Sequence, residues 1–263
     1  MDLQLDGKRA LVTGASRGLG YATALALSRE GCRVAINSRN PDSLAVSADN
    51  IAAESGNPVI SLPGDVTDPA VPENIVRQTV EAFGGLDLLV TNSGGPPAGK
   101  FETFADAAWQ AAFELNLLSH VRLIRAALPY LRQSPAASVL TLTSYSIKQP
   151  IPNLVLSNSI RSATIGLTKT LALELGSEGI RFNSILPAWT ETERVYDLMS
   201  HRAKMNGTSV EEEIAKQSQD SPLGRMGRPD EFANAAVFLL SPAASYITGV
   251  MLSVDGGMYK GTV

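Results

Sequence analysis

The stretch Thr13-Gly14-Ala15-Ser16-Arg17-Gly18-Leu19-Gly20 lies between a short apolar run and a helical pattern near the start of the chain. We expect Gly14 to permit a tight turn, Gly18 to let the backbone approach a pyrophosphate, and Gly20 to allow close contact between helix and strand. The helix that follows would present free N–H groups and a positive dipole end to phosphates. Three glycines are often only a turn, but their place at the first strand-to-helix junction predicts a dinucleotide site.

Outward from this turn, short apolar runs alternate with helical patterns along the whole chain. Near-continuous apolar strands are typical of a parallel sheet covered on both faces. Strands are expected at residues 8–13, 33–37, 58–62, 86–91, 138–143, 181–186 and 250–254. Helices are expected at residues 18–30, 41–54, 69–83, 105–131, 156–175 and 231–240. This alternation predicts a single α/β domain with a Rossmann-like, doubly wound sheet of about seven parallel strands and helices on both faces.

Composition and charge narrow the class of protein. The chain has 263 residues, of which 44% are apolar and 18% charged, so intrinsic disorder is excluded. A net charge of −4 argues against nucleic acid or an anionic membrane as the main partner. A single cysteine, Cys32, cannot form an internal disulfide. The start of the chain lacks the pattern of a signal peptide, and no apolar run approaches the roughly 18 residues that span a bilayer. We expect a soluble, cytoplasmic protein.

Residues 190–228 interrupt the alternation of strands and helices. The segment is polar and charged, and residues 206–207 (Asn-Gly) are typical of a turn. Thr208 or Ser209 stands three residues before a glutamate, the spacing of a capping box, which predicts a short helix there. The segment is either a solvated surface excursion or a lid over the carboxyl ends of the strands, and we favour a substrate lid.

The glycine-rich stretch resembles the cofactor loop of the short-chain dehydrogenase/reductase family. Further landmarks of that family occur in order along the chain: Asp65-Val66, Asn92-Ser93-Gly94, Asn116, residues 187–192 and residues 249–257. The resemblance spans the whole chain and points to the branch of 3-oxoacyl-[acyl-carrier-protein] reductases. It implies that Asp65 contacts adenine, that Asn116 has a structural and proton-relay role, and that the substrate is a small carbonyl or acyl compound.

The resemblance also implies a nicotinamide cofactor. Its expected contacts are Gly14, Ser16, Arg17, Gly18, Leu19, Gly20, Ser38, Arg39, Asp65, Val66, Asn92, Ser93, Gly94, Arg161, Pro187 and Thr192. An NAD site requires a carboxylate at the end of the second strand, but residues 37–39 here read Asn-Ser-Arg. Arg17 and Arg39 are able to form a fork around a 2′-phosphate, unless both are merely solvated surface charges. We therefore expect NADP(H) to be favoured over NAD(H).

The catalytic positions depart from the family pattern. Ser144 aligns with the catalytic serine, but the positions of the usual tyrosine and lysine hold Ser157 and Arg161. A serine hydroxyl is a far weaker acid than an activated phenol, and arginine is not deprotonated in proteins. The loss of a general acid typically costs about 10²–10⁴ in rate. We expect Ser144 to hydrogen-bond the substrate oxygen, Arg161 to orient the nicotinamide ribose and supply positive charge, and Asn116 to hold a water.

Other polar residues near these positions have alternative interpretations. Tyr145 and Lys148 are candidate proton donors, although we favour a surface tyrosine and a solvated loop lysine. His120 and His201 lack metal-ligand spacing and are expected to be ordinary packing or surface residues, so no metal is expected. Glu191, Glu193, Arg194 and Tyr196 begin the lid segment and could meet a substrate, but their spacing alone decides nothing.

Three hypotheses on function follow from this pattern. The first is an NADP(H)-dependent oxidoreductase with a modified proton donor. The second is a protein that binds a nucleotide cofactor but has lost turnover, as a sensor or a partner subunit. The third is an enzyme of another reaction type in the same pocket. The helices at 105–131 and 156–175 carry apolar residues on more than one face, which predicts a homo-oligomer unless these helices pack only on their own sheet. The family resemblance implies that the helices pair across a two-fold axis, and we expect a homotetramer.

Overall fold

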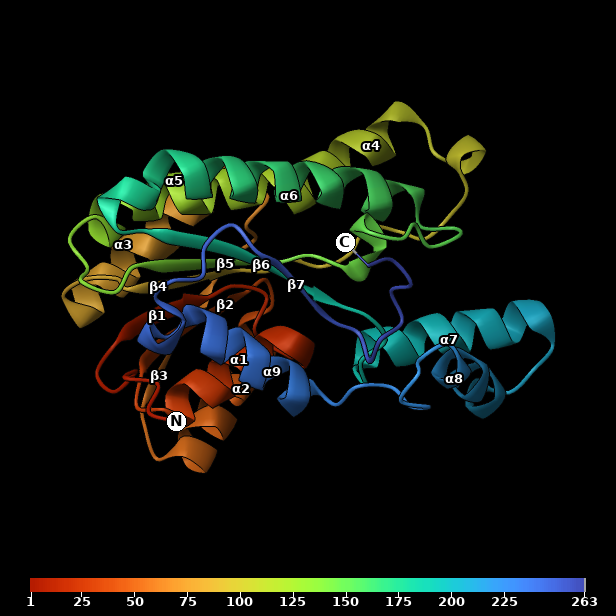
Figure 1. Ribbon diagram of the computed structural model, residues 1–263, viewed down its shortest axis with the longest axis horizontal. Coiled ribbons are helices and arrows are strands. Elements are labelled where there is room, and N and C mark those ends of the chain that lie inside the picture. The colour runs from red at the N-terminus through yellow and green to blue at the C-terminus, as the bar shows by residue number, and fades with distance from the viewer. Residues whose placement is uncertain (263) are drawn as a thin grey trace.

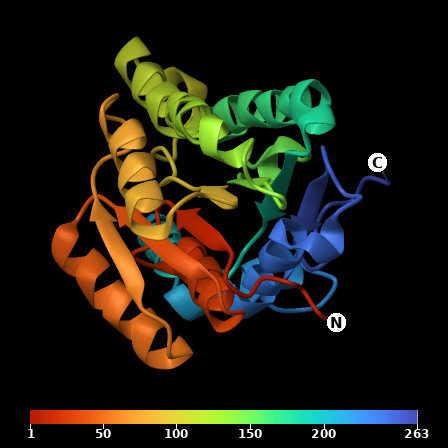
Figure 2. The same ribbon diagram turned by 90° about the vertical axis from the view of Figure 1, so that its left-hand side faces the viewer.

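A computed structural model describes residues 1–262, and all of its named strands lie in one sheet (Figures 1 and 2). The strands are β1 (Arg9–Val12), β2 (Arg33–Ser38), β3 (Val59–Pro63), β4 (Leu88–Thr91), β5 (Ser138–Leu142), β6 (Arg181–Pro187) and β7 (Met251–Val254). Their order is β3-β2-β1-β4-β5-β6-β7, and every neighbouring pair is parallel. The predicted doubly wound sheet is confirmed. The order reverses between β1 and β4, where open α/β sheets bind their ligands.

Helices cover both faces of the sheet (Figure 1). On one face lie α1 (Gly18–Arg29), α2 (Pro41–Ser55) and α9 (Pro229–Leu240). On the other lie α3 (Val71–Phe83), α4 (Asp106–Phe113), α5 (Ser119–Leu131) and α6 (Val155–Leu175). Successive residues of β1 point to opposite faces, so Val12 joins the core under α1 while Leu11 joins the core under α5. The strands are apolar on both sides because each side is buried.

The predicted helix at 105–131 is not continuous. A π-helical segment, Glu114–Leu118, separates α4 from α5, and Asn116 lies at its centre. Such single wide turns are frequent at functional sites. Apolar periodicity could not reveal it, because one extra residue shifts the pattern too little to be read. The effect is to direct the buried Asn116 amide toward the loop after β4, where it bonds Ser93.

Two helices that the alternation did not fully predict form the segment at 190–228. They are α7 (Glu193–Asn206) and α8 (Val210–Gln219), which lie together beyond the carboxyl ends of the strands in Figure 1. Ser209 begins α8: its Oγ accepts from the Glu212 N–H at 3.1 Å, and the Glu212 carboxylate accepts from the Ser209 N–H at 3.0 Å. The predicted capping box is confirmed at Ser209 rather than Thr208.

The longer helix, α7, is held by a narrow apolar stripe. Only Val195, Met199 and Ala203 are buried along it, at a spacing of one helical turn. Val195 and Met199 belong to a third apolar cluster, which also contains Trp189 and Met226. With so few apolar positions, the sequence pattern was that of a polar excursion rather than a helix. Within residues 1–262, no helix is long and apolar enough to cross a membrane.

Candidate active site

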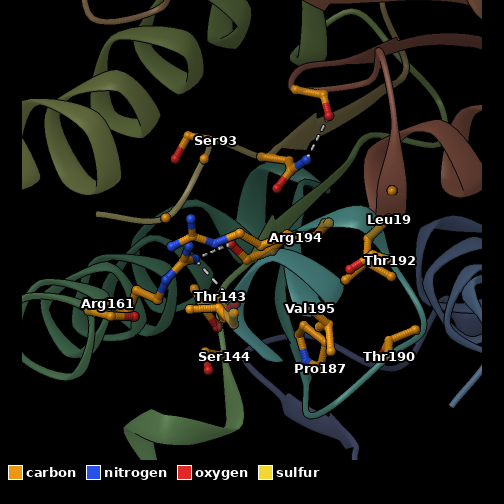
Figure 3. A pocket seen from close by; sticks show the side chains of 18 of the residues that line it. Leu19, Ser93, Thr143, Ser144, Arg161, Pro187, Thr190, Thr192, Arg194 and Val195 are labelled. Atoms are coloured by element: carbon orange, nitrogen blue, oxygen red, sulfur yellow. Dashed lines mark hydrogen bonds between the residues drawn. The ribbon is translucent and has the colours of Figure 1, made fainter. Parts of the chain in front are cut away.

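A cavity of about 390 Å³ opens at the carboxyl ends of the central strands (Figure 3). Its walls come from the loops after β1, β4, β5 and β6 and from α6 and α7. Residues expected at the site that line it are Gly14, Arg17, Gly18, Leu19, Arg39, Asn92, Ser93, Gly94, Ser144, Ser157, Arg161, Pro187 and Thr192. Expected residues outside its lining are Ser16, Gly20, Ser38, Asp65, Val66 and Asn116. The fold thus brings most of the predicted residues around one space.

Several lining residues were not assigned to the site from the sequence. They include Gly95, Pro96, Thr143, Ile151, Leu154, Val195 and Leu198. Gly95 and Pro96 directly follow the Asn-Ser-Gly landmark, and this position next to the motif could have indicated that they line the site. Ile151 and Leu154 come from the loop before α6 and Val195 and Leu198 from α7, and no motif marks these four residues.

The glycine-rich loop is folded tightly against the end of β4. Gly14 has φ +59°, and a Cβ there would lie 2.8 Å from Asn92 Nδ2. The same amide donates to the Gly14 carbonyl oxygen at 3.0 Å. A Cβ on Gly20 would overlap the Gly14 carbonyl oxygen. Both glycines are therefore required for the close packing of β1, β4 and α1.

The N-terminus of α1 is suited to an anionic group. Arg17 at its start makes no capping hydrogen bond with its side chain, and the first turn carries no acidic residue. Beside it, Gly18 has φ +60°, and a Cβ there would meet only Thr192, at 3.7 Å or more. The first N–H groups of the helix therefore face room for a phosphate, so the loop fits the pyrophosphate of a dinucleotide.

The arginines expected at a 2′-phosphate each have a carboxylate partner. Arg17 Nη1 lies 2.6 Å from Glu193 Oε2 of α7, and Arg39 Nη1 lies 3.9 Å from Asp65 Oδ2. Their side chains are 64% and 77% exposed, and exposed ion pairs of this kind are worth about 0–1 kcal/mol. Either guanidinium is thus free to turn to a phosphate at small cost. Nearby, Ser38 Oγ lies 2.9 Å from Ser16 Oγ and joins β2 to the loop.

The catalytic candidates lie on β5 and α6. Ser144 follows β5, and its Oγ accepts from the Ser146 N–H at 3.2 Å. Arg161 of α6 is 9% exposed, and its Nη1 donates to the Leu142 and Thr143 carbonyl oxygens, each at 3.2 Å (Figure 3). Burial, with a smaller effect of another guanidinium, lowers the pKa of Arg161 to about 10. Arg161 therefore stays protonated at neutral pH beside Ser144.

The buried Asn116 connects the π-helical segment to the cavity wall. Its Nδ2 donates to Ser93 Oγ and to the Gly94 carbonyl oxygen, both at 2.8 Å. The backbone carbonyl oxygen of Asn116 accepts a hydrogen bond from Thr164 Oγ1 of α6 at 2.6 Å. Within residues 1–262, the buried Oδ1 has no hydrogen-bond partner. This oxygen can accept from a water, as the proton-relay role requires.

The two histidines lie outside the cavity lining. His120 is buried, with Nδ1 2.7 Å from Thr91 Oγ1. Burial, and secondarily the charge of Arg161, lowers the pKa of His120 to about 3, so the ring is neutral. His201 is exposed on α7. The predicted packing and surface positions are confirmed, and no group of potential ligands within residues 1–262 could hold a metal ion.

The expectation of a surface tyrosine at position 145 is wrong. Tyr145 is 7% exposed and lines the cavity, because the chain enters a 3-10 turn (Tyr145–Ile147) directly after Ser144. The turn places the Tyr145 ring in an apolar cluster with Trp189 and Leu186. Burial raises the pKa of Tyr145, which makes its phenol a weaker acid. Lys148 points elsewhere: its Nζ lies 5.2 Å from the centre of the Tyr259 ring, and it does not line the cavity.

Comparison with known proteins assigns the family. The family model described as enoyl-(acyl carrier protein) reductase matches residues 14–259. The chain belongs to the short-chain dehydrogenase/reductase family. Family members similar to it include the L-rhamnose 1-dehydrogenase (NAD(P)(+)) of Sphingomonas sp. (strain SKA58), 34% identical over 97% of both chains. The 3-oxoacyl-[acyl-carrier-protein] reductase FabG of Vibrio cholerae is 33% identical over 98% of this chain and 99% of the relative.

A solved member of the short-chain dehydrogenase/reductase family has nearly the same fold. The L-sorbose reductase of Gluconobacter frateurii, complexed with NADPH and L-sorbose, superposes with a TM-score of 0.95. It is 31% identical, and the match covers 99% of this chain and 100% of that one. The family therefore carries different dehydrogenase and reductase activities on this scaffold, and the cavity of each member decides its substrate.

Proposed function

We propose that this protein is an NADP(H)-dependent oxidoreductase that interconverts a carbonyl compound and its alcohol, resembling 3-oxoacyl-[acyl-carrier-protein] reductases. Ser157 and Arg161 stand in place of the family's usual tyrosine and lysine. The observation that carries the proposal is the convergence of the glycine-rich loop, Ser144 and the buried Arg161 around one cavity. The NADPH complex of the related L-sorbose reductase supports the cofactor.

The cofactor would lie along the cavity from the glycine-rich loop to Ser144. When bound, NADPH supplies the hydride. The loop and the first turn of α1 hold its pyrophosphate, while Arg17 and Arg39 exchange their exposed carboxylate partners for the 2′-phosphate. Remaining contacts come from Leu19, Asn92, Ser93, Gly94, Pro187 and Thr192, which line the same space.

The chain's own residues stabilise charge on the substrate oxygen rather than relay a proton through a phenol. Ser144 Oγ donates a hydrogen bond to that oxygen, and the buried Arg161 supplies a fixed positive charge. After hydride transfer the substrate alkoxide would take one proton from a water, and the hydroxide that remains is neutralised by solvent; Asn116 Oδ1 is the acceptor that would hold this water. This set lacks a strong general acid, so the turnover number is expected to fall below that of relatives with the usual pair.

One observation favours a second candidate function, cofactor binding without turnover. Within residues 1–262, Tyr145 is the only phenol that lines the cavity, and burial raises its pKa. A scaffold that keeps the cofactor loop and loses its acid is suited to a sensor or a partner subunit. The two functions differ in whether a hydride leaves the bound cofactor.

Calorimetric titration of NADPH and NADH, followed by a hydride-transfer screen with ketones, tests the proposal. We expect NADPH to bind at least about tenfold more tightly than NADH, since a charged hydrogen bond is worth roughly 1.5–3 kcal/mol. Arg39→Ala should remove most of that difference. Arg77→Ala, which removes an exposed arginine paired with Glu81 on α3, is the matched control and should not. Equal affinities for both cofactors contradict the preference, and NADPH binding with no ketone turned over favours the second function.

The segment at 190–228 is included in the proposal as a substrate lid. Val195 and Leu198 of α7 line the cavity, and α7 touches the cofactor loop through the Arg17–Glu193 pair. Opening α7 would break the exposed Arg17–Glu193 ion pair and the hydrogen bond from Arg194 Nη2 to the Pro96 carbonyl oxygen, and it would uncover the apolar stripe of α7. These few contacts are compatible with opening during each catalytic cycle.

A further inference from the structure

The cavity holds more positive charge than its carboxylates balance. Its charged lining residues are Arg17, Arg39, Arg161, Glu193 and Arg194. The single carboxylate, Glu193, already pairs with Arg17 at 2.6 Å. In the part of the chain that the structure describes, neither Arg161 nor Arg194 lies within 4.0 Å of a carboxylate oxygen. Two guanidinium groups thus face the cavity without a counter-charge.

The side chain of Arg161 is held in place by hydrogen bonds, but only one of its three nitrogen atoms makes them. Both of its hydrogen bonds come from Nη1, which donates to the Leu142 and Thr143 carbonyl oxygens at 3.2 Å. Its Nε and Nη2 donate to no group within residues 1–262. A buried guanidinium with unused donors is costly unless an anion accepts from it. The Thr143 contact places this charge next to Ser144, at the end of the cavity where the substrate oxygen is expected.

Arg194 reaches the same point from α7. Its Nη2 donates to the Pro96 carbonyl oxygen at 3.2 Å, so the side chain crosses from the lid segment to the loop after β4. Figure 3 shows its guanidinium beside that of Arg161. The two charges repel, and with burial this repulsion lowers the pKa of Arg161. An oxyanion between them would relieve the repulsion and accept hydrogen bonds from both.

We propose that Arg161 and Arg194 together bind a carboxylate of the substrate, so that the protein acts on oxo acids and the corresponding hydroxy acids. This inference rests on the proposed oxidoreductase function and names its substrate class. The cofactor offers two other acceptors for these donors, its nicotinamide ribose, which Arg161 is expected to orient, and its pyrophosphate. The ribose is uncharged and would leave both guanidinium charges unbalanced, so the pyrophosphate is the other possible oxyanion. The glycine-rich loop and the first turn of α1 already provide donors for it, whereas Arg161 bonds the carbonyl that precedes Ser144. The substrate carboxylate is therefore the anion that this geometry favours.

A bound carboxylate would also affect the position of the lid segment. Arg194 is the second residue of α7, so an anion that binds it would draw the start of the helix toward the loop at Pro96. A neutral ketone would leave the Pro96 bond of Arg194 in place but would not add a link through an anion between Arg194 of α7 and Arg161 of α6. The carboxylate would then raise the affinity for the substrate and also favour closure of α7 over the cavity.

Kinetics with matched acids and esters test this substrate class. NADPH oxidation would be followed with 2-oxo-, 3-oxo- and 4-oxopentanoate and with their methyl esters. The wild type should prefer at least one acid over its ester about tenfold or more in kcat/KM. Arg194→Gln should lower kcat/KM for that acid about 10- to 100-fold, the range for a lost charge-assisted hydrogen bond, and leave the ester within about twofold. Arg194→Lys should recover part of the loss.

A matched control removes the same charge from the same helix. Lys204 is exposed on α7 and does not line the cavity, so Lys204→Gln should behave as the wild type with every acid. If Arg194→Gln weakens NADPH binding about tenfold and affects acids and esters alike, the pair binds the cofactor and the inference is overturned. Equal preference for acid and ester in the wild type also overturns it.

A binding measurement separates this inference from the proposed function. The same acids are titrated calorimetrically into protein saturated with NADP⁺, which requires no turnover. Binding of an acid that Arg194→Gln weakens about tenfold, and Lys204→Gln does not, supports the carboxylate site even when the wild type oxidises no NADPH. Absence of binding for all three acids overturns the carboxylate site.

Discussion

The charge beside Ser144 is carried by Arg161, a residue that can stabilise an alkoxide but cannot exchange a proton at neutral pH. Its pKa, lowered by burial to about 10, still leaves it protonated there. Ser157 lies four residues earlier on the same helix and lines the same cavity, but its hydroxyl is a poor acid. The proposed function therefore assigns charge stabilisation to Arg161 and the supply of the proton to a water that Asn116 Oδ1 would hold.

A neighbouring residue makes the stability of the protein depend on pH. The buried His120 has a pKa of about 3, below the roughly 6.5 of an unfolded histidine, so the unfolded chain takes up a proton first. Its contribution is fully present above about pH 6.5 and is lost as the pH falls toward about 3. We predict that the free energy of unfolding in urea falls by up to about 1.4 kcal/mol per pH unit from this group.

Variants of both histidines check this assignment. His120→Asn should flatten the pH dependence between about pH 6.5 and 4.5, where unfolded histidine titrates. His201→Asn is the control, because His201 is exposed, and should keep the slope of the wild type. An unchanged slope in His120→Asn would contradict a neutral, buried His120.

At the scale of elements, the sheet was predictable because its strands are buried on both faces. Runs such as Leu88–Thr91, in which every residue is buried, give an apolar signal that does not depend on distant contacts. The π-helical segment and α7 were not predictable in the same way. One depends on a single extra residue around Asn116, and the other on a stripe of three buried side chains. Their signals are too small to separate from a regular helix or a polar loop.

Site residues that belong to a sequence motif could be predicted. Site residues whose side-chain direction depends on tertiary packing could not. The glycine-rich loop and Ser144 lie where their motifs indicated. By contrast, Tyr145 was expected at the surface, because a 3-10 turn after a strand has no sequence signature strong enough to orient it. Arg194 is a residue that could meet a substrate by its position in the lid segment, but its contact with Pro96 was not predictable, since it joins segments far apart in the chain.

The connection between α7 and α8 yields a prediction at this scale. Glu213 accepts hydrogen bonds from Thr208 Oγ1 at 2.6 Å, Asn206 Nδ2 at 3.2 Å and Lys216 Nζ at 3.1 Å. These contacts lower its pKa to about 2, so the carboxylate holds the turn above about pH 4.5 and loses it as the pH falls toward 2. Glu213→Gln should increase amide hydrogen exchange in α7 and α8 severalfold at pH 7 and leave the sheet unchanged.

The neighbouring glutamate supplies the control for this experiment. Glu211 lies on the same turn of α8 but is exposed and is not bonded to the Asn206–Thr208 turn. Glu211→Gln should leave the exchange of α7 as in the wild type. Equal protection of α7 in Glu213→Gln and the wild type would contradict a role of Glu213 in holding the lid segment.

At the scale of the whole molecule, the chain leaves apolar side chains exposed on the face covered by α4, α5 and α6. Leu173 of α6 is 75% exposed and Phe113 of α4 is 41% exposed. We predict a homotetramer in which these helices pair between subunits, as the family resemblance implies. Light scattering should give about four times 27.8 kDa at micromolar concentration. Leu173→Glu should lower that mass, whereas a monomeric wild type would contradict the prediction.

The whole molecule is proposed to transfer a hydride in this cavity, although within residues 1–262 the only phenol that lines it, Tyr145, has a raised pKa. The most direct test is deuteride transfer from NADPH labelled at C4 to a panel of oxo acids, ketones and 3-oxoacyl thioesters, with the alcohol analysed by mass spectrometry. The account predicts that the wild type yields an alcohol with one deuterium on the carbinol carbon, and that Ser144→Ala and Arg161→Gln each lower its rate about 10²-fold or more. Tight binding of NADPH with no labelled alcohol from any compound in the panel would contradict it.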